Sequence, residues 1–450
     1  MVIESQATVR HRPHLLYYGD DFTGATDTLA TAAQAGLRSM LLLAPPTETR
    51  LAALGEIDCL GIAGIARSLA PMQMRDELAP IADLARRLQP RVLHYKTCST
   101  FDSAPGVGSI GEAVRLLSPA MPSPWVAIIG GQPNLGRFCL FGNLFAAAGA
   151  GGEVFRIDRH PTMRQHPVTP MHEADLRQHL AQQGLEDIGL IPWTSYVDGG
   201  GSSSPSMNVS SERLQALRAA GVKHVLWDVS RQNDLPEIGE QLWAAARRAP
   251  LLTVGPSSVT QAIAGAMRQR TTVASAGVRA ATGPVLTLAG SLSPVTASQV
   301  AAAKSFEMVR LDAARVIEED GQYCASAAAE LVRHLKAGRH TLACTVPLQG
   351  TATGGATVNA LRLAQAGGQL LAQVLREAPV SRLAIAGGDT SSHGMRALDA
   401  WGLEHVGTLA PGAPLCRLKS DVPAFDGMEI LLKGGQMGGE DLFERLAHGA

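Results

Sequence analysis

The sequence has few aromatic residues and no closely spaced cysteine pair. Phe, Trp and Tyr together make up 4% of the 450 residues, which favours helices packed closely on sheets over an aromatic platform for nucleic acid. None of the six cysteines forms a C-x-x-C pair, and several lie in apolar stretches. This pattern argues against a zinc site and a disulfide framework, and it favours a reducing cytoplasm.

Long runs of one charge and long apolar segments are absent as well. The chain has 39 basic and 40 acidic residues, a formal net charge of −1, and no basic stripe that would attract nucleic acid. No apolar run reaches the roughly 20 residues that span a bilayer, and the first ten residues do not resemble a signal peptide. We expect a cytoplasmic protein without nucleic-acid or membrane partners, and a homo-oligomer is compatible with this composition.

Hydrophobic residues make up 46% of the chain, enough for substantial cores. At this length two domains are the natural expectation. The polar, weakly patterned segment 268–283 is interpreted as the linker between them. We predict an α/β protein with two α/β domains, largely parallel sheets and an active-site cleft between the domains, which span residues 13–268 and 284–447.

Three segments near the end of the chain share the pattern of an apolar strand, a glycine-rich turn and a helix. The strands are 383–386, 285–289 and 428–432, and each is followed within a few residues by Gly and Ser or Thr, or by repeated Gly. Glycine lets backbone amides approach a ligand closely, and a helix N-terminus favours an anion. Because such loops lie beyond the carboxyl ends of parallel strands, the three together predict one phosphate pocket.

The first of these segments also predicts local details. Thr390 or Ser391 is a suitable N-cap, and Met395, Leu398 and Trp401 are spaced for one helix face. Asp389 would repel a phosphate unless a divalent cation bridges the two or the carboxylate caps the turn.

In the first half of the chain, charged residues follow probable strands. Asp20 and Asp21 follow the strand 15–18, and adjacent carboxylates of this kind suit a polyol, a metal or proton transfer, whereas N-capping is the structural alternative. Arg67 and Lys96 end two later strands and suit a carboxylate ligand, although each alone could simply form a salt bridge. The hydroxyl residues that accompany these two cations are Ser68, Ser99 and Thr100.

Taken in order, these motifs resemble those of the four-carbon acid sugar kinase family. The resemblance covers most of the chain, and six motifs in the same order make it specific. The motifs are Asp20-Asp21-Phe-Thr-Gly-Ala25, Arg67-Ser68, Lys96-x-x-Ser99-Thr100, Gly290-Ser-Leu-Ser293, Gly387-Gly-Asp-Thr390 and Lys433-Gly-Gly-Gln-Met-Gly-Gly439. Asp389 and the pair Gln436-Met437 depart from the more usual family residues, as does the segment 106–109.

The resemblance implies that the N-terminal domain binds the acid sugar and that the C-terminal domain binds ATP. It implies transfer of the γ-phosphate to a hydroxyl of threonate, erythronate or a 3-oxo-tetronate. Mg²⁺ is expected to neutralise charge, and Asp20 or Asp21 to align the acceptor hydroxyl and take its proton. The implied nucleotide contacts are Ser291, Ser293, Gly387, Gly388, Asp389, Thr390, Gly435, Gly438 and Gly439.

Two other functions fit part of the pattern. An NAD-dependent sugar-acid dehydrogenase would also use an α/β fold, but no G-x-G-x-x-G follows the first strand. A non-catalytic sugar-acid-binding protein would not require a full set of phosphate-type loops. The sequence leaves open the particular acid, its stereoisomer, the hydroxyl that is phosphorylated, the metal ligands and the oligomeric state.

Overall fold

A computed structural model describes residues 12–149, 151–166, 168–196, 209–267, 277–290, 293–318, 321–345 and 360–450. For residues 360, 361 and 389 it describes the backbone alone. In this part of the chain no helix combines the length and the apolar character needed to cross a membrane.

The first half of the chain alternates strands and helices. Its strands in the main sheet are β1 (Leu15–Gly19), β2 (Ser39–Leu42), β3 (Cys59–Ala63), β4 (Val92–Lys96), β5 (Val126–Ile129), β9 (Ile188–Ile191), β10 (His224–Trp227) and β11 (Leu251–Gly255). A separate antiparallel sheet contains β6 (Arg137–Leu140), β7 (Asn143–Ala147) and β8 (Val154–Arg156). The helices are α1 (Phe22–Gln34), α2 (Glu48–Ala53), α3 (Pro71–Leu88), α4 (Ile110–Leu117), α5 (Leu176–Ala181), α6 (Val209–Ala219), α7 (Leu235–Arg248) and α8 (Ser258–Met267).

The second half continues the alternation and adds a long hairpin. Its strands are β12 (Val285–Ala289), β13 (Phe306–Arg310), β14 (His340–Cys344), β15 (Arg382–Ala386), β16 (Ala400–Ala410), β17 (Ala413–Ser420) and β18 (Glu429–Lys433). Its helices are α9 (Pro294–Ala302), α10 (Ala313–Val316), α11 (Gln322–Lys336), α12 (Ala360–Glu377), α13 (Gly388–Ala397) and α14 (Leu442–His448).

All strands except β6 to β8 join one sheet that runs through both halves. Their order is β13-β14-β12-β15-β18-β17-β16-β2-β3-β1-β4-β11-β5-β10-β9. The ladders are parallel except around β16 and β17, which pair antiparallel with their neighbours. Strands β1, β3, β4 and β11 are buried along their full length, as expected when helices cover both faces of a parallel sheet. The predicted α/β fold is therefore confirmed.

Helices cover the sheet on both faces. One core extends through both halves and includes buried side chains of α1, α7 and α8 together with those of α11, α12 and α13. The opposite face has two separate cores, one under α3, α4 and α5 and one under α9 and α14. Helix α1 of the first half contributes side chains to this shared core and packs against elements of the second half.

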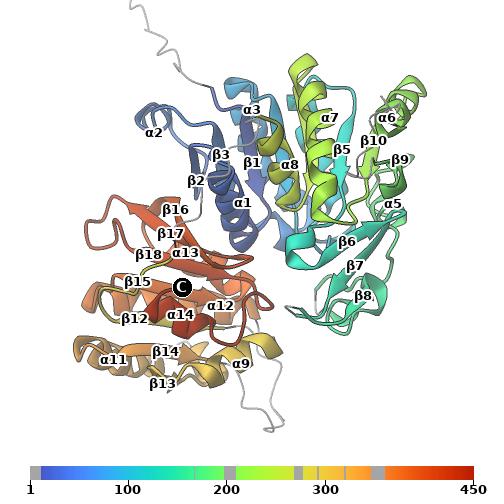
Figure 1. The fold of residues 1–450 in the computed structure, drawn as a ribbon. Coiled ribbons are helices and arrows are strands. Elements are labelled where there is room, and N and C mark those ends of the chain that lie inside the picture. Colours follow the sequence, from blue (N-terminus) through green and yellow to red (C-terminus); the bar gives the residue numbers. More distant parts are fainter. Residues whose placement is uncertain are drawn as a thin grey trace, which may run out of the picture.

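The two halves meet at the hairpin of β16 and β17 (Figure 1). Strand β16 pairs with β2 through Leu403 opposite Leu41 and Gly402 opposite Leu42. Helix α1 packs against β16, β17 and α13, and Gln34 Nε2 donates to Thr408 Oγ1 at 2.9 Å. A short ladder and one helix thus join the halves.

Two local predictions are wrong. Helix α13 begins at Gly388, so its N-cap is Gly387 rather than Thr390 or Ser391. Gly387 has φ +122°, which side-chain-bearing residues rarely adopt, and this is where the chain turns into the helix. Trp401 lies in β16 instead of on the helix face, because α13 ends at Ala397. Residues 268–276 of the expected linker lie outside the described residues.

Candidate active site

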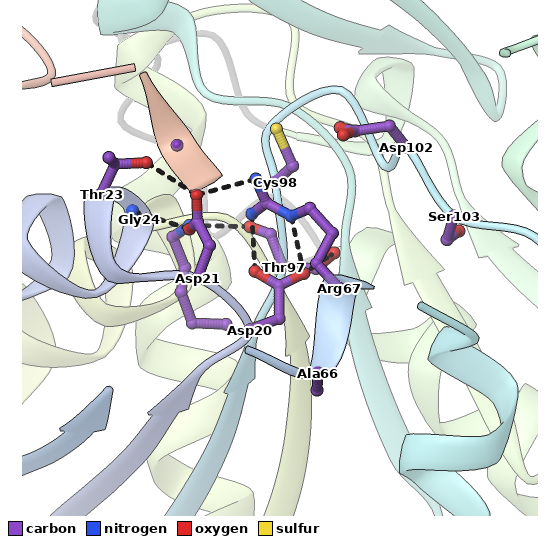
Figure 2. Close-up of polar contacts among 12 residues, drawn as sticks. Asp20, Asp21, Thr23, Gly24, Ala66, Arg67, Thr97, Cys98, Asp102 and Ser103 are labelled. Atoms are coloured by element: carbon purple, nitrogen blue, oxygen red, sulfur yellow. Dashed lines mark hydrogen bonds and ion pairs between the residues drawn. The ribbon is translucent and has the colours of Figure 1, made fainter. Parts of the chain in front are cut away.

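Asp20 and Asp21 lie at the carboxyl end of β1, where one arginine binds both carboxylates (Figure 2). Arg67 Nη2 is 2.6 Å from Asp20 Oδ1, and its Nη1 is 2.9 Å from Asp21 Oδ2. Arg67 Nε also donates to Asp20 Oδ2, at 3.3 Å. Because β3 pairs directly with β1, the short 3₁₀ helix η1 (Ala66–Ser68) that follows β3 delivers Arg67 to this point. The arginine offsets the repulsion between two adjacent buried carboxylates.

The surroundings drive the pKa values of the two acids in opposite directions. Burial raises the pKa of Asp20, and Arg67 offsets this only in part. Burial would also raise the pKa of Asp21, but Arg67, Lys96 and hydrogen bonds at the start of α1 together lower it. Asp21 is therefore the acid that stays ionised most readily at neutral pH.

Those hydrogen bonds make Asp21 the N-cap of α1. Its Oδ1 accepts from the Gly24 amide at 2.8 Å, and its Oδ2 accepts from the Thr23 hydroxyl at 2.7 Å. The capping role that was the alternative to a catalytic one therefore applies to Asp21. A second contact of the same carboxylate, with the other half of the chain, is described below.

Lys96 is the last residue of β4, which pairs with β1 on the side opposite β3. Its ammonium is buried and donates to the Thr97 carbonyl at 2.8 Å. Among the described residues no carboxylate forms an ion pair with it. A Cβ on Gly24 would lie 2.5 Å from Lys96 Nζ and 2.6 Å from Asp21 Oδ1, so only glycine leaves room for these groups. Lys96 thus has donors available beside Asp21.

The loop after β4 adds buried hydroxyls and a third carboxylate. Thr100 Oγ1 donates to Asp102 Oδ1 at 2.6 Å, and Ser99 is buried beside it. Burial would raise the pKa of Asp102, but Arg67, Cys98 and Thr100 lower it to about 2. Ser68, by contrast, is exposed and donates to the Ile65 carbonyl, so the structure does not bring its hydroxyl to the acids.

The second half reaches this site through the turn between β15 and α13. A Cβ built on Gly388 would lie 3.7 Å from Asp21 Oδ2. The Gly387 amide donates to the Lys433 carbonyl at 2.9 Å, which joins this turn to the end of β18. The backbone that begins α13 therefore faces the acid pair directly, across the boundary between the two halves.

The glycine loop after β18 is held from behind by α9. Thr296 Oγ1 donates to the Gly435 carbonyl at 2.9 Å. Gln299 Nε2 lies 3.0, 3.2 and 2.9 Å from the carbonyls of Met437, Gly438 and Gly439. These bonds fix the carbonyls of the loop on the side of α9.

Lys433 lies beneath this loop. Its side chain is fully buried, and Nζ donates to Thr296 Oγ1 at 2.9 Å and to the Gly435 carbonyl at 3.5 Å. No carboxylate among the described residues pairs with it, and burial lowers its pKa to about 7. Such a lysine is suited to a nearby anion that the protein itself does not supply.

The remaining predicted nucleotide residues are placed as follows. Ser293 is the N-cap residue of α9. Thr390 is buried, and its Oγ1 would lie 2.5 Å from a Cβ on Gly290, so these two loops touch. Ser291 and the side chain of Asp389 lie outside the described part of the structure.

The side chains were also tested for a metal site. In the described ranges no three His, Cys, Asp or Glu side chains are grouped closely enough to hold a metal ion. Mg²⁺ in phosphoryl-transfer sites needs only one or two carboxylates, because water and phosphate supply the other oxygens. Asp21 at the Gly388 turn fits that smaller requirement.

Sequence reasoning missed several residues that the structure brings to these loops. Thr97 donates to Asp20 Oδ2 at 3.3 Å. Lys433 opens the last of the six motifs but was given no role of its own, although it ends a strand just as Lys96 does. Thr296 and Gln299 show no comparable signal, because their function depends on a loop about 140 residues away.

Two family models match the chain. One is described as a sugar-binding N-terminal domain and matches residues 15–263, and the other is a nucleotide-binding C-terminal domain that matches residues 286–443. Two crystal structures share the fold. These are a Salmonella typhimurium protein with TM-score 0.77 and 23% identity, covering 96% of this chain and 98% of that one, and Haemophilus influenzae protein HI1011 with TM-score 0.69, 22% identity and the same coverage.

Several similar proteins are named as kinases. The chain is 37% identical to a 3-oxo-isoapionate kinase of Paraburkholderia graminis, over 97% of this chain and 94% of that protein. It is 29% identical to a 3-oxo-tetronate kinase of Cupriavidus necator, over 97% of both chains. The resemblance inferred from the motifs is therefore confirmed, and the chain belongs to the four-carbon acid sugar kinase family, a family of ATP-dependent carbohydrate kinases.

Proposed function

We propose that this kinase transfers the γ-phosphate of ATP to a hydroxyl of a 3-oxo sugar acid. The observation that carries the proposal is the approach of Asp21, from the first half, to Gly388, from the second. A carboxylate lies there beside a glycine turn at a helix N-terminus, which is a suitable place for a phosphate. The 3-oxo acids are favoured because the similar kinases named above act on 3-oxo-isoapionate and 3-oxo-tetronate.

In this proposal Asp21 aligns the acceptor hydroxyl and accepts its proton. Its Oδ2 is the carboxylate oxygen near the Gly388 turn, and a base must first be within reach of the reacting hydroxyl. Its lowered pKa makes it a weak base. Phosphoryl transfer tolerates this because positioning and charge stabilisation dominate over proton removal.

Asp20 and Arg67 would act mainly by positioning Asp21. Both carboxylates accept hydrogen bonds from the protein, but Asp20 is more deeply buried, and the Gly388 turn lies near Asp21. Arg67 already donates to both Asp20 and Asp21, so fewer of its donors are available to the substrate. Substrate binding then depends more on Lys96, whose ammonium has free donors, and on the hydroxyls of Ser99 and Thr100.

ATP would bind through the second half. The turn Gly387–Thr390 and the loop containing Gly435, Gly438 and Gly439 would contact the phosphates through backbone amides, with Ser291 and Ser293 at the third loop. Lys433 would supply a positive charge below them. Asp21 would help to hold Mg²⁺, which would supply charge neutralisation.

A panel assay tests the proposal. ADP release would be measured with Mg-ATP and each of 3-oxo-tetronate, 3-oxo-isoapionate, threonate and erythronate. We expect release with at least one 3-oxo acid and a lower kcat/KM with the acids that lack the oxo group. Absence of acid-dependent ADP release across the panel would overturn the proposed function.

A further inference from the structure

Arg137 is a buried cation for which the mechanism above has no use. It begins β6 and is only 5% exposed. One terminal nitrogen, Nη1, donates to the Leu135 carbonyl. Its Nε is buried without a hydrogen-bond acceptor, and among the described residues no carboxylate pairs with the guanidinium. A buried, unsatisfied donor on a charged group is costly, so it calls for an explanation.

The atoms that remain available define the shape of the missing partner. With Nη1 occupied by Leu135, the edge formed by Nε and Nη2 is left. Two parallel N–H groups on this edge match the two oxygens of a carboxylate. Burial lowers the pKa of Arg137, although Cys98 and Asp102 counteract part of this effect. An anion in this position would stabilise the charged guanidinium.

Arg137 lies near the polar loop that follows β4, the loop that begins at Thr97 beside the acid pair. Cys98 and Asp102 act electrostatically on both Arg137 and Arg67, so both residues lie near each of the two guanidinium groups. Figure 2 shows Cys98 next to the Arg67 guanidinium and Asp102 farther along the same segment, which follows β4. Thr100 accompanies Asp102 on this segment. The available edge therefore belongs to the same polar region as Lys96 and the acid pair.

The backbone around Arg137 is fixed relative to Asp21. The Gln132 amide donates to the Arg137 carbonyl at 2.8 Å, and Gln132 Nε2 donates to Asp27 Oδ2 at 3.0 Å. Asp27 lies in α1, the helix that Asp21 caps. Ser258 Oγ, at the start of α8, donates to the Gly131 carbonyl at 2.7 Å. The separation between Arg137 and Asp21 is thus set before any ligand binds, as an anchor for substrate alignment requires.

We propose that Arg137 binds the carboxylate of the sugar-acid substrate through Nε and Nη2, and this rests on the proposed function. The substrate would then lie between two ends, with its carboxylate on Arg137 and its acceptor hydroxyl at Asp21. Arg67 is less suited to the carboxylate, because Asp20 and Asp21 already occupy its donors. Selectivity for acids over neutral sugars of the same length would come from Arg137.

The test compares an acid with a neutral analogue. Arg137→Gln, Arg137→Lys and the exposed control Arg159→Gln would be assayed with 3-oxo-tetronate and with erythrulose, which has CH₂OH in place of the carboxylate. For erythrulose, the KM would be measured if it is phosphorylated, and the competitive inhibition constant if it is not. ATP binding would be followed by calorimetry. We expect Arg137→Gln to raise the KM for the acid roughly 10- to 150-fold, with erythrulose and ATP changed less than about twofold. Arg137→Lys should be intermediate.

Three results would overturn this inference: an unchanged KM for the acid, equal losses for acid and erythrulose, or loss of ATP binding. The last would assign Arg137 to a nucleotide phosphate instead. If Arg137→Gln does not fold, the KM of Arg137→Lys for the acid is the test, because lysine keeps the positive charge but lacks the paired Nε and Nη2 donors. Failure of the wild-type protein to release ADP with any sugar acid would instead contradict the proposed function, whatever the Arg137 variants show.

Discussion

The two halves of this kinase use the ends of parallel strands in different ways. In the first half, β1, β3 and β4 end in or lead directly to charged side chains, namely Asp20, Asp21, Arg67 and Lys96. In the second half, β15 and β18 lead into glycine turns in which backbone groups are presented. One architecture therefore supplies a site made of side chains on one side and a site made of backbone on the other.

This difference follows from the chemistry of the two ligands. A small sugar acid has a carboxylate and hydroxyls in a fixed arrangement, and side chains can match them one by one. A triphosphate is a repeated anion that suits amides and a helix N-terminus. The side-chain site buries two carboxylates next to each other, those of Asp20 and Asp21. In the backbone site, hydrogen bonds from Thr296 and Gln299 hold the glycine loop after β18. The variants below test this contrast.

The largest effect is expected for Asp21→Asn. If Asp21 aligns and deprotonates the acceptor as proposed, loss of its carboxylate should lower kcat about 10²- to 10⁴-fold, with ATP affinity nearly unchanged. Steady-state kinetics and calorimetry would measure the two quantities, and exposed Asp83→Asn is the matched control. An effect limited to the KM for the acid would move Asp21 from catalysis to binding.

Arg67→Met should act on stability as well as on activity. It leaves two adjacent buried carboxylates without their arginine, which is expected to cost about 3–5 kcal/mol of unfolding free energy. Urea unfolding would measure this against Arg86→Met, which breaks an exposed ion pair worth at most about 1 kcal/mol. Equal effects of the two variants would mean that the acid pair does not depend on Arg67.

Gly388→Ala probes the backbone site without disturbing the fold. Among the described residues, a methyl group there would contact Asp21 Oδ2 alone, at an ordinary distance of 3.7 Å, so the protein should fold normally. The same methyl would stand in the path of a phosphate, and we expect ATP affinity to fall at least about tenfold, or ~1.4 kcal/mol. Gly265→Ala, in open space on α8, is the control. Unchanged ATP binding would contradict the placement of the phosphate turn.

A further effect concerns the pH dependence of stability. The pKa of Lys433 is lowered from 10.5 to about 7, so between these pH values the unfolded chain binds more protons than the folded one. Wild-type stability should therefore rise with pH over this window, relative to Lys433→Met, by at most about 1.4 kcal/mol per pH unit. Below pH 7 the full penalty is present and the difference should level off.

Urea unfolding of wild type and Lys433→Met at pH 7, 8 and 9 measures this difference. Lys336→Met, at an exposed position in α11, is the control and should run parallel to the wild type. Parallel curves for Lys433→Met would mean that Lys433 is paired or solvated in the folded protein.

Much of the local structure could be predicted from residue patterns. The strand that ends before Asp20 and the three strand–glycine–helix units are all present, because apolar runs and glycines act over a few residues. The hairpin of β16 and β17 was missed. Its spacing around Trp401 imitates a helix face, and its strand character depends on pairing with β2 and β18.

The sequence by itself determined which strand ends carry charge and which carry glycine, since these are local properties of the chain. Only the tertiary structure decided which charges neutralise one another. Arg67 lies 47 residues from Asp20 and meets it because β3 lies beside β1, while β4 brings Lys96 from the other side. Strand order is not a local property, and neither is burial. For that reason the ion pairs of Arg67 with the two acids, the unpaired edge of Arg137 and the lowered pKa of Lys433 could be recognised only in the folded protein.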